Sequence, residues 1–149
     1  MEKGKQEGEE KELKILLVED LKEHAFIIKS SLEESDLKNK IWICHDGEEA
    51  LDFLYNRGNY ASKGEYPKPD VVLLDLRLPK IDGMEVLKQM KSEEDLKDIP
   101  VIVLTASKRE VDIIGAYKEG VTSYLMKSAF IVQRTGKMEN LLEAILSLR

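Results

Sequence analysis

Short runs of consecutive apolar residues alternate along the chain with segments in which apolar residues repeat at helical spacing. Continuous apolar runs are typical of strands buried on both faces, which occur in parallel sheets with helices on each side. The pattern therefore predicts a (βα)5 arrangement. The runs occupy residues 13–18, 41–44, 70–74, 100–104 and 122–126, and the helical segments occupy residues 21–34, 47–56, 84–91, 108–118 and 138–148.

Five strand–helix units are too few to close an eight-stranded barrel. We therefore predict an α/β fold with an open, doubly wound, five-stranded parallel sheet in the flavodoxin-like order 2-1-3-4-5. That order makes the first and third strands neighbours. It places a ligand site at their carboxyl ends, where the strand order reverses.

The start of the chain and one internal connection depart from this alternation. Residues 1–12 contain almost nothing apolar after Met1, so we predict a disordered charged tail ahead of a single domain at residues 13–149. Residues 57–69, rich in Gly, Pro and Tyr, form a long connection. A connection of this length is either a recognition loop or a tolerated surface insertion, and the sequence leaves both open.

Composition and charge exclude several classes of function. The 149-residue chain has a net charge of −6, which argues against nucleic-acid binding through a basic face. No apolar run reaches the roughly 18 residues of a membrane span, and the N-terminus lacks the apolar segment of a signal peptide. The single cysteine, Cys44, cannot form an internal disulfide. We expect a soluble cytoplasmic protein that binds neither nucleic acid nor a membrane.

Carboxylates stand at the carboxyl ends of two predicted strands. Glu19 and Asp20 follow the first apolar run, and Asp75 follows the third. The predicted strand order brings the three side chains into one pocket, where they repel one another unless a cation joins them. Oxygen ligands with access to water suit Mg²⁺, and a carboxylate beside a metal ion can accept a phosphoryl group. The sequence therefore predicts a Mg²⁺-assisted aspartyl phosphate at Asp75.

Two further strand ends carry groups that bind phosphoryl oxygens. Thr105 ends the fourth apolar run and Lys127 follows the fifth. A hydroxyl donates a hydrogen bond to one phosphoryl oxygen, and a lysine ammonium neutralises another. Each residue alone has an ordinary structural explanation. Chance does not readily place five such groups at neighbouring strand ends.

Helix capping is the main structural alternative for the polar residues near these strand ends. Asp20 with Glu23, and Ser107 with Glu110, match the capping-box pattern. We interpret Ser107 as a cap, and we favour a metal role for Asp20 because Asp75 is also present. The two histidines of the chain lack metal-ligand spacing and are interpreted as non-catalytic.

Four motifs lie between Lys14 and about Lys127: LVED at 17–20, LLDLRLPKIDG at 73–83, LTA at 104–106 and YLMK at 124–127. With these motifs the chain resembles the receiver domain of two-component response regulators. The segment Tyr55-Asn56-Arg57-Gly58 and the loop after it resemble stand-alone receivers that serve phytochrome-type sensor histidine kinases.

The resemblance implies a role for each residue of the predicted cluster. It makes Asp75 the phosphoacceptor and the acidic pair at 19–20 the Mg²⁺ ligands, with the strand-end threonine and lysine binding the phosphoryl group. It adds the backbone carbonyl of Arg77 as a metal ligand. It also adds Tyr124 as an aromatic residue that rotates after phosphorylation.

The resemblance implies a signalling switch and not an enzyme, apart from hydrolysis of its own aspartyl phosphate. A sensor histidine kinase would donate the phosphoryl group, and a downstream effector or phosphotransfer protein would respond. The responding surface would combine the fourth helix, the fifth strand and the fifth helix, and a homodimer through it is a further expectation. Too few residues follow Lys127 for a DNA-binding or enzymatic output domain.

Two positions depart from the family pattern. Ser128 follows Lys127 where the family usually has a proline reached through a cis peptide bond. Arg77 is bulkier than the residues common at its position, and we hypothesise that it shields the aspartyl phosphate or pairs with it. The alternatives are a Mg²⁺-dependent phosphatase of the aspartate-nucleophile class and a receiver that functions without phosphorylation. The phosphatase would carry an acid in place of Arg77, and the phosphorylation-independent receiver is disfavoured because all five site residues are present.

Overall fold

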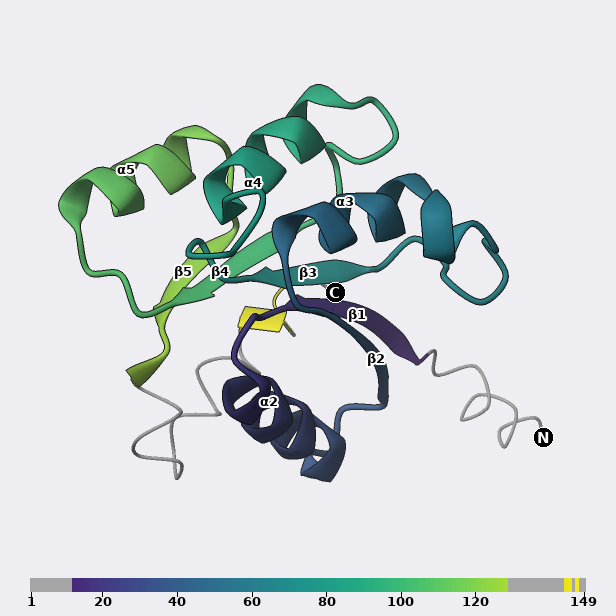
Figure 1. Cartoon of the computed structure of the whole chain (residues 1–149). Helices are drawn as coiled ribbons and strands as arrows, with labels where there is room; N and C mark the ends of the chain where they lie inside the picture. The colour runs from purple at the N-terminus through teal and green to yellow at the C-terminus, as the bar shows by residue number, and fades with distance from the viewer. Residues whose placement is uncertain (1–11, 129–143, 146, 148–149) are drawn as a thin grey trace.

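The computed structural model of the chain describes residues 12–128, 144–145 and 147. Five parallel strands form one sheet in the order β2-β1-β3-β4-β5 (Figure 1). The predicted fold class and strand order are thus confirmed. The strands are β1 (Leu13–Val18), β2 (Asn39–Cys44), β3 (Val71–Leu74), β4 (Val101–Thr105) and β5 (Ser123–Met126). The helices are α2 (Lys22–Glu34), α3 (Gly47–Tyr55), the 3-10 helix η1 (Gly58–Tyr60), α4 (Gly83–Ser92) and α5 (Glu110–Lys118).

Two predicted segments fall largely outside the described residues. These are the charged tail at residues 1–12, of which the exposed Glu12 is described, and the last helix at residues 138–148. Ile145, from that last segment, is buried. No helix in the described part of the chain is both long enough and apolar enough to span a membrane.

The sheet separates two hydrophobic layers. In Figure 1, α3, α4 and α5 cover one face of the sheet, and α2 covers the other. Alternate residues of β1 serve the two layers, because successive side chains of a strand point to opposite faces. Leu16 and Val18 pack in the layer between the sheet and helices α3, α4 and α5. Ile15 and Leu17 pack in the opposite layer, together with α2 and Ile145. Burial on both faces explains why the strands are continuous apolar runs.

Tyrosines anchor the long connection at residues 57–69 to the layer under α3. Asn56 ends α3 in a left-handed conformation, and its side-chain amide donates to the carbonyl oxygens of Tyr60 (3.0 Å) and Tyr66 (2.9 Å). The two tyrosine rings pack edge to face with their centroids 4.8 Å apart, and both lie against Phe53. The connection is therefore folded onto the core, although residues 61–65 at its tip are exposed.

Two glycines allow the loop after β3 to lie against the neighbouring helices. A Cβ atom on Gly47, at the start of α3, would stand 1.8 Å from the carbonyl oxygen of Ile81. A Cβ atom on Gly83, at the start of α4, would stand 2.2 Å from the carbonyl oxygen of Asp75. The Gly83 contact fixes the backbone immediately after β3, where the sequence predicts the phosphoacceptor, and the Gly47 contact fixes the far end of the same loop.

Replacing Gly47 with alanine should destabilise the fold by about 1–3 kcal/mol, because the added methyl group overlaps backbone atoms. Gly64→Ala is the matched control, since no described atom lies within 4 Å of a Cβ placed there. Urea unfolding followed by circular dichroism gives both free energies of unfolding. Equal stability of the two variants would contradict the close approach of α3 to the loop.

Candidate functional site

Three carboxylates meet where β1 and β3 end. The register of these strands pairs Val18 with Leu74, so the residues that follow them leave the sheet side by side. Oxygen atoms of Glu19, Asp20 and Asp75 lie within 4.8 Å of one another. Glu19 and Asp75 are only 1% and 4% exposed, whereas Asp20 is half-buried. Glu19 and Asp75 thus form the buried part of the cluster, and Asp20 lies at its accessible rim.

A buried lysine and a buried threonine complete the cluster. The Nζ atom of Lys127 lies 3.0 Å from Oδ2 of Asp75 and 2.9 Å from Oε1 of Glu19. The hydroxyl of Thr105 donates to Oδ1 of Asp75 at 2.8 Å, and the backbone N–H of Arg77 donates to the same oxygen at 3.0 Å. The structure therefore brings together all five strand-end groups that the sequence singles out.

Burial sets the electrostatics of this cluster. Desolvation raises the pKa of Glu19 above its ordinary value of 4.5 and the charge of Asp75 adds to the rise, while Lys127 and the N–H of Leu21 oppose it. Burial alone would lower the pKa of Lys127, but its hydrogen bonds to Glu19 and Asp75 raise it. One ammonium thus faces more than one carboxylate. The excess negative charge and the all-oxygen donor set fit a divalent cation such as Mg²⁺.

Asp20 does not cap the helix that follows it. The residue before the first turn of α2 is Leu21, and no side chain among the described residues caps that turn. The capping alternative for Asp20 is therefore wrong. Its carboxylate stays at the rim of the cluster, where a metal ion would also keep water ligands.

A second polar network lies between the cluster and α5. The hydroxyl of Tyr124 donates to the carbonyl oxygen of Ser107 at 3.0 Å, and the hydroxyl of Ser107 donates to Oδ2 of Asp112 at 2.5 Å. The guanidinium of Arg77 lies 3.0 Å from the same Oδ2. The capping interpretation of Ser107 is also wrong, because Arg109 occupies the cap position of α5. Of the predicted site residues, Arg77 and Tyr124 thus have their side chains in this network and not in the cluster.

Sequence reasoning missed two residues that contact the predicted site. The Nδ1 atom of His45 lies 3.0 Å from the carbonyl oxygen of Glu19. His45 follows β2, the neighbour of β1 in the predicted order, and that position was the available signal. Asp112 lies inside α5, where no strand-end pattern marks it. Only the placement of α5 brings it to Arg77.

The side chain of Lys127 reaches the cluster although the peptide bond that follows Lys127 is trans. Every peptide bond in the described residues is trans, including the one between Lys127 and Ser128. The cis peptide that the family resemblance implies is thus absent from this part of the chain. The ammonium group nevertheless contacts both Glu19 and Asp75.

Comparison with known proteins agrees with this geometry. The family model of the response regulator receiver domain matches residues 15–135 of the sequence. The chain belongs to the receiver domain family. Response regulator Rcp1 of Synechocystis is 45% identical over 114 residues, which are 76% of each chain.

Two solved structures of response regulators are also similar to this receiver domain. The phosphorylated cyanobacterial phytochrome response regulator RcpA is 40% identical with a TM-score of 0.83, over 93% of this chain and 97% of that one. The Mn²⁺-bound form of Rcp1 is 39% identical with a TM-score of 0.77, over 91% of this chain and 92% of that one. The predicted family, and the predicted similarity to phytochrome response regulators, are confirmed.

Replacing Lys127 with methionine should destabilise the metal-free protein by about 3–5 kcal/mol at neutral pH, because Glu19 and Asp75 stay buried without their cation. The folded-state pKa of Glu19 is already raised and would rise further. Below pH 4.5, the ordinary pKa of Glu19, its carboxyl group is protonated in both states of the variant and costs no stability. As the pH rises through the folded-state pKa of Glu19, the variant loses stability because the carboxyl group must ionise while buried. The deficit of the variant relative to wild type should therefore shrink on acidification.

The control is Lys88→Met, which removes the same charge from an exposed position on α4. Urea unfolding of all three proteins in EDTA, across a range of pH, measures the deficits. A deficit that is independent of pH, or equal in the two variants, would show that Lys127 does not compensate the buried carboxylates.

Proposed function

We propose that this receiver domain is a phosphorylation-controlled switch and that Asp75 is its phosphoacceptor. The observation that carries the proposal is the set of donors around the Asp75 carboxylate. Thr105 and the backbone N–H of Arg77 donate to one of its oxygens, and Lys127 donates to the other. These donors are of the kind that a phosphoryl group on Asp75 requires.

The proposed reaction is a transfer from a phosphohistidine to the carboxylate. A carboxylate oxygen of Asp75 attacks phosphorus, the new O–P bond forms as the P–N bond breaks, and the leaving imidazole nitrogen takes up a proton. Lys127 neutralises one oxygen of the transferred group, and Thr105 donates a hydrogen bond to another. In such transfers, positioning and charge stabilisation account for most of the catalysis.

The residues that would hold Mg²⁺ are Glu19, Asp20, Asp75 and, through its backbone carbonyl, Arg77. When bound, the ion supplies positive charge that neutralises the incoming phosphoryl group. The excess of carboxylates over ammonium groups in the cluster supports this assignment. The Mn²⁺-bound form of the relative Rcp1 supports it as well.

We also propose that the protein is cytoplasmic and that its phosphoryl donor is a sensor histidine kinase of the phytochrome type, by similarity to RcpA. The proposed responders are a downstream effector or phosphotransfer protein. We assign no enzymatic activity beyond hydrolysis of the protein's own aspartyl phosphate. The aspartate-nucleophile phosphatases place an acid two residues after the nucleophile, and here that residue is Arg77, which pairs with Asp112.

The proposed responding surface includes α5, the fourth helix of the strand–helix alternation. Val111, Ile114 and Tyr117 lie three residues apart on this helix and are 62%, 51% and 51% exposed. Tyr124 of β5 reaches the loop that leads into the helix through its bond to Ser107. An exposed apolar stripe next to the switch residues suits a second copy of the chain or an effector.

Incubation with acetyl phosphate and Mg²⁺ should add one phosphoryl group to the wild-type protein, and Asp75→Asn should remain unmodified. Intact-mass spectrometry with and without EDTA measures both. Asp95→Asn, which changes an exposed aspartate after α4, is the matched control and should be labelled like wild type. Labelling of Asp75→Asn, or no labelling of any protein where another receiver domain is labelled, would overturn the proposed function.

Phosphorylated wild type should self-associate more strongly than the unphosphorylated protein, and Ile114→Lys should abolish the difference because it places a charge in the apolar stripe. Sedimentation velocity measures the association. Phe26→Lys is the matched control, since Phe26 is a 70% exposed apolar residue on α2, across the sheet from α5. Equal effects of the two substitutions would contradict a role of the α5 stripe.

A further inference from the structure

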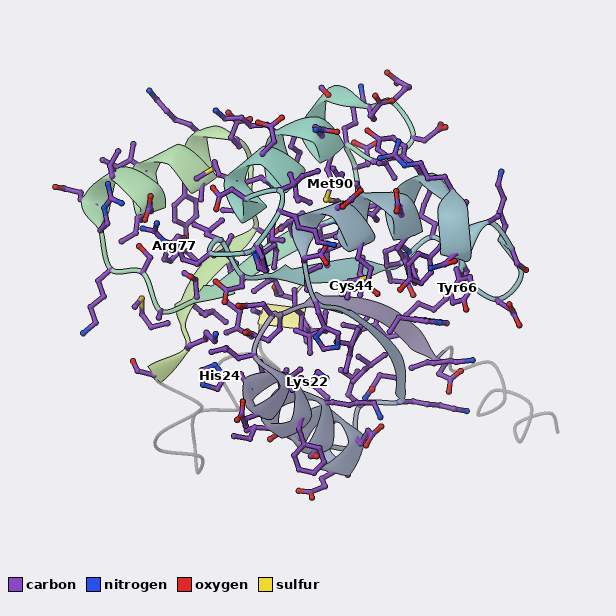
Figure 2. The ribbon with its side chains drawn as sticks, viewed as in Figure 1. Lys22, His24, Cys44, Tyr66, Arg77 and Met90 are labelled. Atoms are coloured by element: carbon purple, nitrogen blue, oxygen red, sulfur yellow. The ribbon has the colours of Figure 1, made fainter. Side chains whose placement is uncertain are left out.

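The side chain of Arg77 has a partner that the proposed function does not explain. Its backbone N–H contacts Asp75, but its guanidinium turns away and lies 3.0 Å from Oδ2 of Asp112 on α5. Figure 2 shows Arg77 on the side of the sheet that α5 covers. The Arg77 side chain is 55% exposed and the Asp112 side chain 20% exposed, so the pair lies at the surface beside the cluster.

Asp112 also belongs to a chain of contacts that leads back to Asp75. The hydroxyl of Ser107 donates to Asp112, while the backbone N–H of Ser107 donates to the hydroxyl of Thr105 at 3.4 Å. Thr105 in turn donates to Asp75. Tyr124 binds the carbonyl oxygen of Ser107. Through Ser107, the Arg77–Asp112 ion pair is therefore connected to Thr105 and Tyr124, the two residues that the proposed switch uses.

Asp112 carries a full negative charge at neutral pH. The hydroxyl of Ser107 is the largest cause that holds the pKa of Asp112 below its ordinary value of 3.8, and Arg109 and Arg77 lower it further. In the unphosphorylated protein, Arg77 therefore pairs with a carboxylate on α5 that also accepts from the hydroxyl of Ser107.

We infer that Asp112 is a positioning residue that competes with the phosphorylated Asp75 for the guanidinium of Arg77. The inference rests on the proposed function. Phosphorylation replaces the single charge of a carboxylate with a more highly charged group that has three acceptor oxygens, and a guanidinium binds such groups through paired hydrogen bonds. The backbone N–H of Arg77 already donates to Asp75, so the proposed exchange moves the side chain of Arg77 and not its backbone.

The exchange would act on α5. In the unphosphorylated protein the Arg77–Asp112 pair ties the first turn of this helix to the loop that follows β3. Transfer of Arg77 to the phosphoryl group releases that tie. Asp112 lies between Val111 and Ile114, two residues of the exposed apolar stripe, so the release alters the surface proposed to bind partners.

The test is a double-mutant cycle read by beryllofluoride, which binds a carboxylate in the place of a phosphoryl group. Fluorine NMR titrations in Mg²⁺ give its affinity for wild type, Asp112→Asn, Arg77→Gln and the double variant. Without its competitor, Arg77 is free for the bound anion. Asp112→Asn should therefore bind beryllofluoride about two- to fivefold more tightly than wild type, the size expected for a partly exposed ion pair. In the Arg77→Gln background the same substitution should have no effect.

Two further variants separate competition from general charge effects. Asp95→Asn removes one exposed negative charge elsewhere and should leave the affinity unchanged. Asp112→Glu keeps the charge and should restore the wild-type affinity. A gain of affinity that persists without Arg77, or that Asp95→Asn reproduces, would overturn the inference.

The outcome for wild type distinguishes the two levels of the proposal. Wild-type binding of beryllofluoride that Asp75→Asn abolishes, together with an unchanged affinity of Asp112→Asn, overturns the competition alone. Failure of the wild type to bind beryllofluoride or to be labelled by acetyl phosphate overturns the proposed function, and the competition with it.

Discussion

The contact of one buried ammonium with two buried carboxylates is the constraint on which the site depends. Burying any one of these charges alone would cost several kilocalories per mole. Lys127 makes the burial of Glu19 and Asp75 tolerable, and their charges do the same for Lys127. Because Glu19, Asp75 and Lys127 directly follow β1, β3 and β5, the cluster forms only when β1, β3, β4 and β5 have paired. The polar site and the apolar sheet are therefore specified together.

The two oxygens of Asp75 belong to different environments. Oδ2 faces the charged contact with Lys127, whereas Oδ1 accepts from the neutral Thr105 hydroxyl and a backbone N–H. The first environment is buried and governed by charge. The second leads outward through Ser107 to Tyr124 and α5. On the Oδ1 side, hydrogen bonds through the hydroxyl of Thr105 and the backbone of Ser107 thus connect the Asp75 carboxylate to Tyr124.

The sequence predicted the sheet and the cluster for one physical reason. Strands buried on both faces are continuous apolar runs, and in a parallel sheet their polar ends meet at one edge. Contacts made through helices were not predictable in this way. Asp112 meets Arg77 only because α5 packs where it does, and Ser107 matches a capping pattern although its hydroxyl binds Asp112. A local sequence pattern limits the groups that a residue can contact, and the tertiary fold determines which of these contacts form.

The tyrosine anchors of the connection after α3 have a consequence for how this protein can diverge. Tyr60 and Tyr66 hold the two ends of the tip at residues 61–65 against Phe53, while the tip itself is exposed. Substitutions in the tip therefore change the chemistry of an exposed surface without moving the sheet edge that carries Asp75. The exposed tip can therefore vary in sequence at little cost to the fold or to the geometry around Asp75.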